Sequence, residues 1–150
     1  MILSLSLFTI FSVALLVGTE FAVSAFVNPV LWKLDPPARA DATRRFAALL
    51  GKVMPIWYAL DFVLLVIEAF DQRRHSGLPE IIAACTLWAA AILASVLWLV
   101  PINNRMIQLR PESPSGTALS EHKQWDALHR VRVSALCLAF LAFLFGVFRS

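Results

Sequence analysis

The hydrophobic positions of the chain gather into four long stretches, separated by three more polar segments. The stretches run from about residue 2 to 26, 53 to 70, 78 to 100 and 131 to 148. A transmembrane helix needs about 20 mainly apolar residues, and each stretch approaches that length. The pattern predicts an all-α, integral membrane four-helix bundle with up-down topology, in which residues 1–150 form a single four-span domain. A cleaved signal peptide is the alternative for the first stretch, and the lack of a basic segment before it disfavours that alternative.

The three polar segments differ in kind. In the first, Asp35 followed by two prolines is a helix-start signal, and apolar residues then recur at helical spacing at Phe46, Leu49, Leu50 and Val53. This pattern predicts a short amphipathic surface helix between spans 1 and 2. The second segment, DQRRHSG, is a short turn. The third, residues 101–124, contains three prolines and a glycine and predicts a loop, with the last helix starting near Ser120.

Composition supports lipid as the solvent. Hydrophobic residues make up 59% of the chain and charged residues only 15%, whereas an average globular chain is about one quarter charged. The net charge of +3 fits the basic loops of membrane proteins, and no nucleic-acid recognition motif is present. Cys85 and Cys137 both lie in apolar runs, where cysteine behaves as a small hydrophobe, and neither belongs to a metal-ligand pattern.

Basic residues are distributed unequally between the two sides of the predicted bundle. Ten lie in or near the first and third polar segments and three lie on the other side. The ten are Lys33, Arg39, Arg44, Arg45, Lys52, Arg105, Arg110, Lys123, Arg130 and Arg132, and the three are Arg73, Arg74 and Arg149. The positive-inside rule then places both termini outside and the two long connections in the cytoplasm, in a bacterial inner membrane.

One acid, Glu20, interrupts the apolar run ALLVGTEFAVSAFVNP. Ionisable residues inside a membrane span are costly and are functional candidates by default. Glu20 and Asn28 are eight residues apart, so they share one helix face. That face runs from inside the bilayer to its cytoplasmic edge. A lone carboxylate in lipid would be driven to its neutral form, so we expect a basic partner, His129 or Arg132. Asp61 should lie deeper in the bundle.

Simpler interpretations stay open for several of these residues. Asn103, Asn104 and Arg105 follow Pro101, where polar residues commonly cap a helix or extend to the headgroups. Trp125 fits an interfacial anchor, and His129 fits a headgroup position. Glu20 and Asp61 fit such structural roles least well, because they lie within apolar spans.

The segments WLVPINNR and WDALHRVR, together with GTEFAVSAFVNPVLWKL in the first span, resemble the anthrone oxygenase-like family of small four-helix membrane proteins. The resemblance implies oxidation of anthrones to anthraquinones with molecular oxygen as co-substrate, and it leaves open whether any cofactor is bound. It makes the catalytic candidates Glu20, His129, Arg132 and Arg105, and the substrate-binding candidates Asn28, Asn103, Asn104 and Trp125. Asp61 is a further substrate-binding candidate because it is an ionisable residue within a span. Any metal would be held by His129 and Glu20, a thin ligand set.

The residues suit this chemistry. Oxidation of an acidic C–H needs a base, for which His129 and Glu20 are candidates, and cations for the developing oxyanion, for which Arg105 and Arg132 are candidates. The sequence therefore predicts a membrane protein that oxidises an apolar aromatic, anthrone- or quinone-like molecule. Two alternatives remain: a non-catalytic subunit that packs against a larger membrane partner, and a small proton-coupled transporter lined by Asp61 and Glu68. Homo-oligomerisation is compatible with each, and a transporter of four spans would require it.

Overall fold

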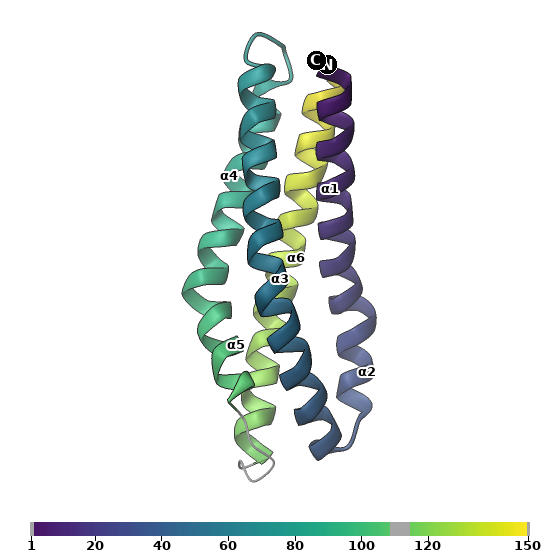
Figure 1. Ribbon diagram of the computed structural model, residues 1–150, viewed down its shortest axis with the longest axis vertical. Helices are drawn as coiled ribbons and strands as arrows, with labels where there is room; N and C mark the ends of the chain where they lie inside the picture. The colour runs from purple at the N-terminus through teal and green to yellow at the C-terminus, as the bar shows by residue number, and fades with distance from the viewer. Residues whose placement is uncertain (1, 109–114, 150) are drawn as a thin grey trace.

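The structure is a computed structural model that describes residues 2–108 and 115–149, and all of its regular elements are helical. Four rods make up the bundle (Figure 1). The first contains α1 (Ile2–Ala22), the π-helical turn η1 (Val23–Val27) and α2 (Asn28–Lys33). The second is α3 (Pro36–Asp71), the third contains α4 (Leu78–Ala94), the π-helical turn η2 (Ser95–Leu99) and α5 (Val100–Ile107), and the fourth is α6 (Ser115–Arg149).

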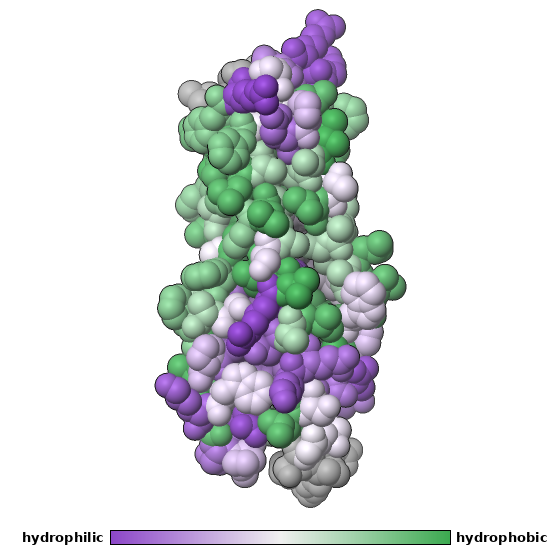
Figure 2. All heavy atoms as spheres, turned by 180° about the vertical axis from the view of Figure 1, so that it is seen from behind, coloured by the Kyte–Doolittle hydropathy of each residue, from purple (hydrophilic) through white to green (hydrophobic). Residues whose placement is uncertain are grey.

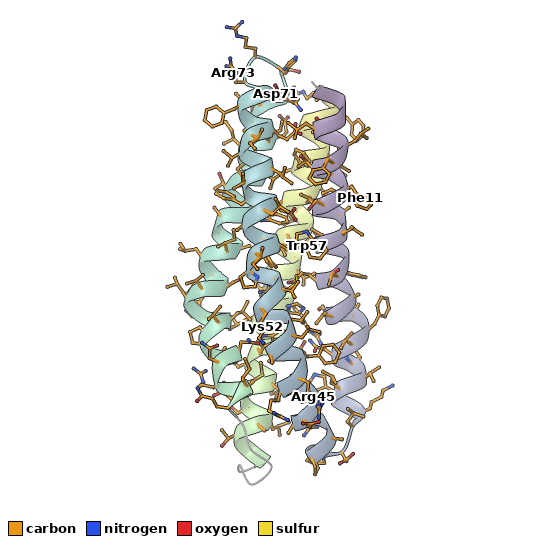
Figure 3. All side chains as sticks on the ribbon, viewed as in Figure 1. Phe11, Arg45, Lys52, Trp57, Asp71 and Arg73 are labelled. Atoms are coloured by element: carbon orange, nitrogen blue, oxygen red, sulfur yellow. The ribbon has the colours of Figure 1, made fainter. Side chains whose placement is uncertain are left out.

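The rods run alternately up and down, and both termini lie at the same end of the bundle (Figure 1). Each rod is long and apolar enough to cross a membrane. Large apolar side chains point outward, including Ile56 and Phe148, which are 73% and 80% exposed, and Figure 3 shows Phe11 directed away from the bundle. Surfaces of this kind belong in lipid. The predicted all-α, four-span membrane bundle is confirmed.

The apolar outer surface forms a band between two polar ends. Figure 2 shows hydrophobic side chains over the upper and middle part of one face, with hydrophilic side chains at the top and across the lower part. Inside the bundle, the core contains the fully buried Leu16, Trp88, Leu136 and Phe143. A Cβ added to Gly146 would lie only 2.6 Å from a side-chain carbon of Ile81, so α4 and α6 pack tightly there.

The predicted separate surface helix is not present, because its residues belong to the single long helix α3. The helix starts as predicted, with the Asp35 side chain accepting a hydrogen bond from the backbone N–H of Ala38. Nothing after this start ends the helix before the membrane span. The buried face of the segment packs into the bundle, where Ala47 contacts Ile102 and Met106 of α5, so the segment is part of the bundle and not a separate element.

The third connection is also shorter than predicted. The third rod continues through Pro101 to Ile107, and α6 starts at Ser115 rather than near Ser120. Pro101 lies in the first turn of α5, and the preceding turn η2 is a wide π-helical turn, in which the backbone N–H of Val100 bonds to the carbonyl of Ser95. Proline at such a position costs little backbone hydrogen bonding. Residues 109–114, which include Arg110, lie outside the described part of the chain.

Candidate functional site

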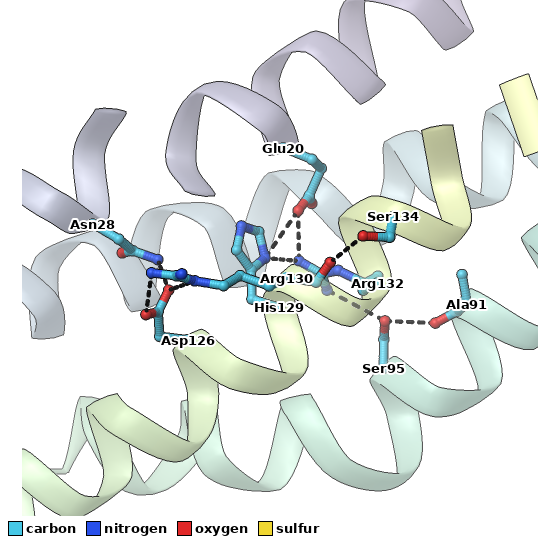
Figure 4. Close-up of polar contacts among 9 residues, drawn as sticks. All are labelled: Glu20, Asn28, Ala91, Ser95, Asp126, His129, Arg130, Arg132 and Ser134. Carbon is cyan, nitrogen blue, oxygen red and sulfur yellow. Dashed lines mark hydrogen bonds and ion pairs between the residues drawn. The ribbon is translucent and has the colours of Figure 1, made fainter. Parts of the chain in front are cut away.

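Glu20 is buried in the bundle beside two basic residues of α6 (Figure 4). Its side chain is 3% exposed, and its Oε2 accepts a hydrogen bond of 2.7 Å from Nη2 of Arg132. His129 Nδ1 lies 3.2 Å from the same oxygen, and His129 is 1% exposed. The expected basic partner of Glu20 is therefore confirmed, and both candidates fill that role together.

The side chains of Glu20, His129 and Arg132 form a triangle in which each contacts the other two. The position of the proton on His129 therefore depends on both neighbours. Nη2 of Arg132 also lies 3.0 Å from Nδ1 of His129. An arginine can only donate, so Nδ1 either accepts from Arg132 or carries a proton and donates it to Glu20. In the second arrangement a neutral His129 has its lone pair on Nε2. This Nε2 is buried and has no partner among the described residues.

Each of the four rods contributes to the surroundings of this triangle. Ser95 of η2 accepts a hydrogen bond of 3.2 Å from Nη1 of Arg132. The guanidinium carbon of Arg132 lies 5.4 Å from the centre of the Tyr58 ring on α3, a cation–π distance. Trp125 stacks on the His129 ring, with 4.5 Å between centroids and 12° between planes. These contacts fix the orientation of both basic side chains.

The triangle lies in the wall of a cleft of about 700 Å³, within the usual size range of small-molecule sites. The cleft runs between α3 and the third rod, and α1 and α6 form its floor. Most of its lining is apolar, and it includes Val96 and Val100, which are 57% and 41% exposed on the outer surface of the bundle. The cleft therefore opens toward the bilayer.

Three further candidates from the sequence also line this cleft, namely Asn103, Asn104 and Trp125. Asn103 donates a hydrogen bond of 3.1 Å to the backbone carbonyl of Ala47. A Cβ added to Gly51 would lie only 2.8 Å from the Asn103 amide nitrogen, so α3 and α5 come close together here and narrow this end of the cleft.

Asn28 faces a different space. It is 1% exposed and donates a hydrogen bond of 2.8 Å to Asp126. It lines a separate cavity of about 30 Å³ that shares Asn103 and Trp125 with the large cleft. Asn28 is therefore a neighbour of the cleft rather than part of its wall.

The structure places Arg105 and Asp61 away from the cleft lining. Arg105 donates two hydrogen bonds, of 2.8 and 3.0 Å, to Glu121 and is about half exposed. The helix continues through this segment, so Arg105 is turned by about 200° from Asn103, at about 100° per residue. Asp61 is fully buried and accepts a hydrogen bond of 2.5 Å from Ser12. It forms a polar layer of its own on the α1–α3 side.

The site does not suit a metal ion. Within residues 2–108 and 115–149, no group of three or more His, Cys, Asp or Glu side chains could hold a metal ion. The two candidate ligands, Glu20 and His129, both contact the Arg132 guanidinium through their nearest atoms. A second cation at those atoms would be repelled by Arg132.

Lys52, Tyr58 and Ser95 also line the cleft and were not among the site residues predicted from the sequence. Tyr58 is the only tyrosine of the chain, and its buried hydroxyl lies beside the Glu20 carboxylate. A signal for it existed, because Met54, Tyr58 and Asp61 follow the 3.6-residue period of one helix face. Lys52 and Ser95 had no comparable signal.

A model of the anthrone oxygenase family matches residues 44–142, about two thirds of the chain. The match includes Tyr58, Ser95, His129 and Arg132 but starts after Glu20. A search of curated proteins and a search of solved structures found no match. The family match confirms the resemblance seen in the sequence. The chain is thus an integral membrane protein that belongs to the anthrone oxygenase family.

Proposed function

We propose that the protein is an enzyme that oxidises an apolar aromatic, anthrone- or quinone-like molecule with molecular oxygen. The main support is the position of the Glu20–His129–Arg132 triangle in the wall of an apolar cleft that opens toward the bilayer. A flat, lipid-soluble substrate can enter such a cleft without passing through water. Family membership supports the same reaction class.

His129 is the proposed base of the first step. When Nδ1 donates its proton to Glu20, Nε2 can take a proton from the acidic C–H of the substrate. A carboxylate that holds a histidine in the required tautomer and stabilises its charged form is a known catalytic device. The His129 side chain is almost completely buried, and its ring stacks on the Trp125 indole. The substrate must therefore insert deeply into the cleft or displace the indole to reach Nε2 of His129.

Arg132 and Tyr58 are the proposed partners of the developing oxyanion. Loss of the proton moves negative charge onto the substrate carbonyl oxygen, and preorganised donors in a dry site stabilise such charge strongly. Arg132 supplies a cation already held by Glu20 and Ser95. Tyr58 supplies a buried O–H that lies beside the Glu20 carboxylate.

The oxygen step needs only protons from the enzyme. The substrate carbanion forms a C–O bond with dioxygen, and the resulting peroxide takes a proton. Removal of the second hydrogen from the same carbon as a proton breaks the O–O bond, forms the new carbonyl and releases hydroxide, which becomes water. The balance is one anthrone and one O₂ to one anthraquinone and one H₂O, so carbon is oxidised and oxygen reduced. His129 can carry both protons.

The transporter alternative rests on Glu68, which is fully buried and accepts hydrogen bonds from Ser6, Thr9 and Gln72. Glu68, Asp61 and Glu20 lie at successive levels along the bundle. In a transporter, these acids would carry protons in turn across the membrane. Leu16 and Leu65, 0% and 1% exposed, belong to the apolar core between these levels. This packing favours a structural role for Glu68 and Asp61 and favours the enzyme over the transporter.

We also propose that both termini lie outside a bacterial inner membrane and that the cleft opens near its cytoplasmic side. The support is the distribution of the 13 basic residues along the sequence, ten of which lie in or near the first and third polar segments.

The test is oxygen consumption and anthraquinone formation by the purified protein in detergent, with anthrone as substrate and the protein-free rate subtracted. We expect His129→Gln to lower the rate by about 100-fold or more, the usual contribution of a general base. His75→Gln is the matched control, because His75 is exposed in the turn between α3 and α4. Wild-type protein that consumes no oxygen above the protein-free rate, or equal rates in the two variants, would overturn the proposal.

A further inference from the structure

The charges in the cleft wall do not cancel. Its charged residues are Glu20, Arg132 and Lys52. Glu20 and Arg132 neutralise each other across 2.7 Å. Lys52 is exposed, and no acid in the described part of the chain lies within ion-pair distance of it. The cleft therefore presents one positive charge that the described protein does not compensate.

This charge lies at a different level of the cleft from the triangle. On α3, Lys52 and Tyr58 are six residues apart, about 9 Å along the helix axis at about 1.5 Å per residue. Lys52 shares its level with Asn103 and Asn104, close to the point where Gly51 and Asn103 approach each other. Figure 3 shows Lys52 on the part of α3 nearer the end opposite the termini.

Between the two polar levels the lining is apolar. Met54 and Pro55 of α3 lie there, opposite Leu99 and Val100 of the third rod. An occupant that fills the cleft would meet a polar reaction site at one end, an apolar wall in the middle, and a cation with two amides at the other end. That order matches an apolar ring system with an anionic group at its far end.

We infer that the substrates of this protein are aromatic acids, in which a fused apolar ring system carries a carboxylate at the end opposite the carbon that is oxidised. Lys52 binds the carboxylate, and Asn103 and Asn104 provide amide donors at the same level. This inference rests on the proposed function for the identity of the oxidised carbon, while the binding of the acid stands on the cleft alone. Lys52 is a binding residue in this scheme and takes no part in the proton transfers.

The alternative partner of Lys52 is a lipid phosphate, since a lysine near a membrane surface commonly extends to the headgroups. A lipid phosphate would neutralise the charge without any effect on which ring compound binds. The experiment must therefore compare two ligands that differ only in charge.

The test measures binding of anthraquinone-2-carboxylate and its neutral carboxamide to the purified protein by calorimetry in an uncharged detergent. We expect wild-type protein to prefer the carboxylate by about tenfold, which corresponds to about 1.4 kcal/mol. Lys52→Gln should abolish the preference, and Lys52→Arg should keep it. Lys33→Gln is the matched control, because Lys33 is an exposed lysine of the same end that does not line the cleft.

Each ligand also partitions into detergent micelles, which changes its apparent affinity. This effect is the same for every variant, so it cancels when the variants are compared. Equal binding of the two ligands to wild-type protein would overturn the inference, and so would a preference that survives in Lys52→Gln or disappears when anionic phosphatidylglycerol is added. Binding needs no turnover. A carboxylate preference in a protein that consumes no oxygen would therefore refute the proposed function and leave this inference standing.

Discussion

The ion pair between Glu20 and Arg132 makes a quantitative prediction about the free energy of unfolding. The two side chains are 3% and 13% exposed and lie 2.7 Å apart. Replacing Glu20 by leucine leaves the guanidinium buried with Ser95 as its main hydrogen-bond acceptor. Removing one partner of a buried pair costs about 3–5 kcal/mol, because the other charge remains uncompensated. We expect this loss for Glu20→Leu and for Arg132→Leu.

The double variant Glu20→Leu, Arg132→Leu should regain most of this loss. Attraction between the charges is about 4 kcal/mol at a separation of about 4 Å and an effective dielectric constant of about 20, and desolvation of both groups opposes it. Replacement of a whole buried pair by apolar residues is often neutral or stabilising. We therefore expect a double variant within about 1 kcal/mol of wild type, and a coupling energy of several kcal/mol between the two sites.

The assay is a titration of the protein in mixed micelles with a denaturing detergent, followed by circular dichroism. The matched control is the pair of Asp41 and Arg44, which lie 2.6 Å apart with 46% and 44% exposure. Exposed pairs contribute about 0–1 kcal/mol, so this second cycle should show a small coupling. A Glu20→Leu variant as stable as wild type, or equal coupling in the two cycles, would refute the reasoning, since both results describe an acid that faces lipid.

Three further predictions concern the site, the packing and the topology. Tyr58→Phe should lower the oxidation rate by about 100-fold, the size expected for an oxyanion donor, and should lower the free energy of unfolding by no more than about 1.5 kcal/mol, the net contribution of one hydrogen bond, because the lost hydroxyl lies beside Glu20; an unchanged rate would remove Tyr58 from the mechanism. Gly146→Val should destabilise the protein by about 1–3 kcal/mol through overpacking, whereas Gly116→Val should be milder, since nothing lies within 4 Å of its added Cβ; equal losses in unfolding titrations would contradict this. In intact cells expressing a cysteine-free background, an impermeant thiol reagent should label a cysteine at Ser76 and spare one at Arg39, and the reverse pattern would invert the orientation.

The contact of Glu20 with α6 was predictable because it depends only on the order of the helices and on charge balance. Four apolar stretches with short connections dictate an antiparallel bundle, and that topology brings the end of the first rod beside the start of the last. A buried acid requires a compensating charge, and His129 and Arg132 share one helix face at a spacing of three residues. Charge balance and helical period together therefore identified both partners.

Other features depended on contacts that no local pattern encodes. Asp61 has neutral partners, Ser12 and the Trp57 indole that donates to Ser12, so charge balance could not identify them. The segment after Pro36 looked like a surface helix because its apolar face could equally contact lipid or α5. Only the packing of Ala47 against α5 distinguishes these outcomes. Lys52 became a candidate only when the cleft showed which charges were already paired.

The two π-helical turns explain how the polar residues of both bent rods face the interior. In a regular α-helix, residues eight apart differ by about 80° around the axis, at about 100° per residue. Glu20 and Asn28 flank η1 at this spacing, and Ser95, the first residue of η2, and Asn103 of α5 have the same spacing. A π-helical turn bonds residue i to i+5 and takes more residues per turn, which reduces this difference. The reduction fits the observed contacts, because Glu20 and Asn28 both bond to α6.

In the third rod, the π-helical turn η2 has the same effect on the polar residues on the other side of the cleft. Ser95 bonds to Arg132 while Asn103, two turns further along, bonds to α3, and both line the cleft. With a regular helix between them, the two members of each pair would differ in direction by about 80° around the helix axis. Single-turn π-bulges of this kind are frequent at functional sites. Here η2 brings Ser95 and Asn103 to the same cleft, while η1 lets Glu20 face that cleft and Asn28 face the small cavity beside it. The backbone of both rods is therefore irregular where the polar residues of the cleft and its neighbouring cavity lie.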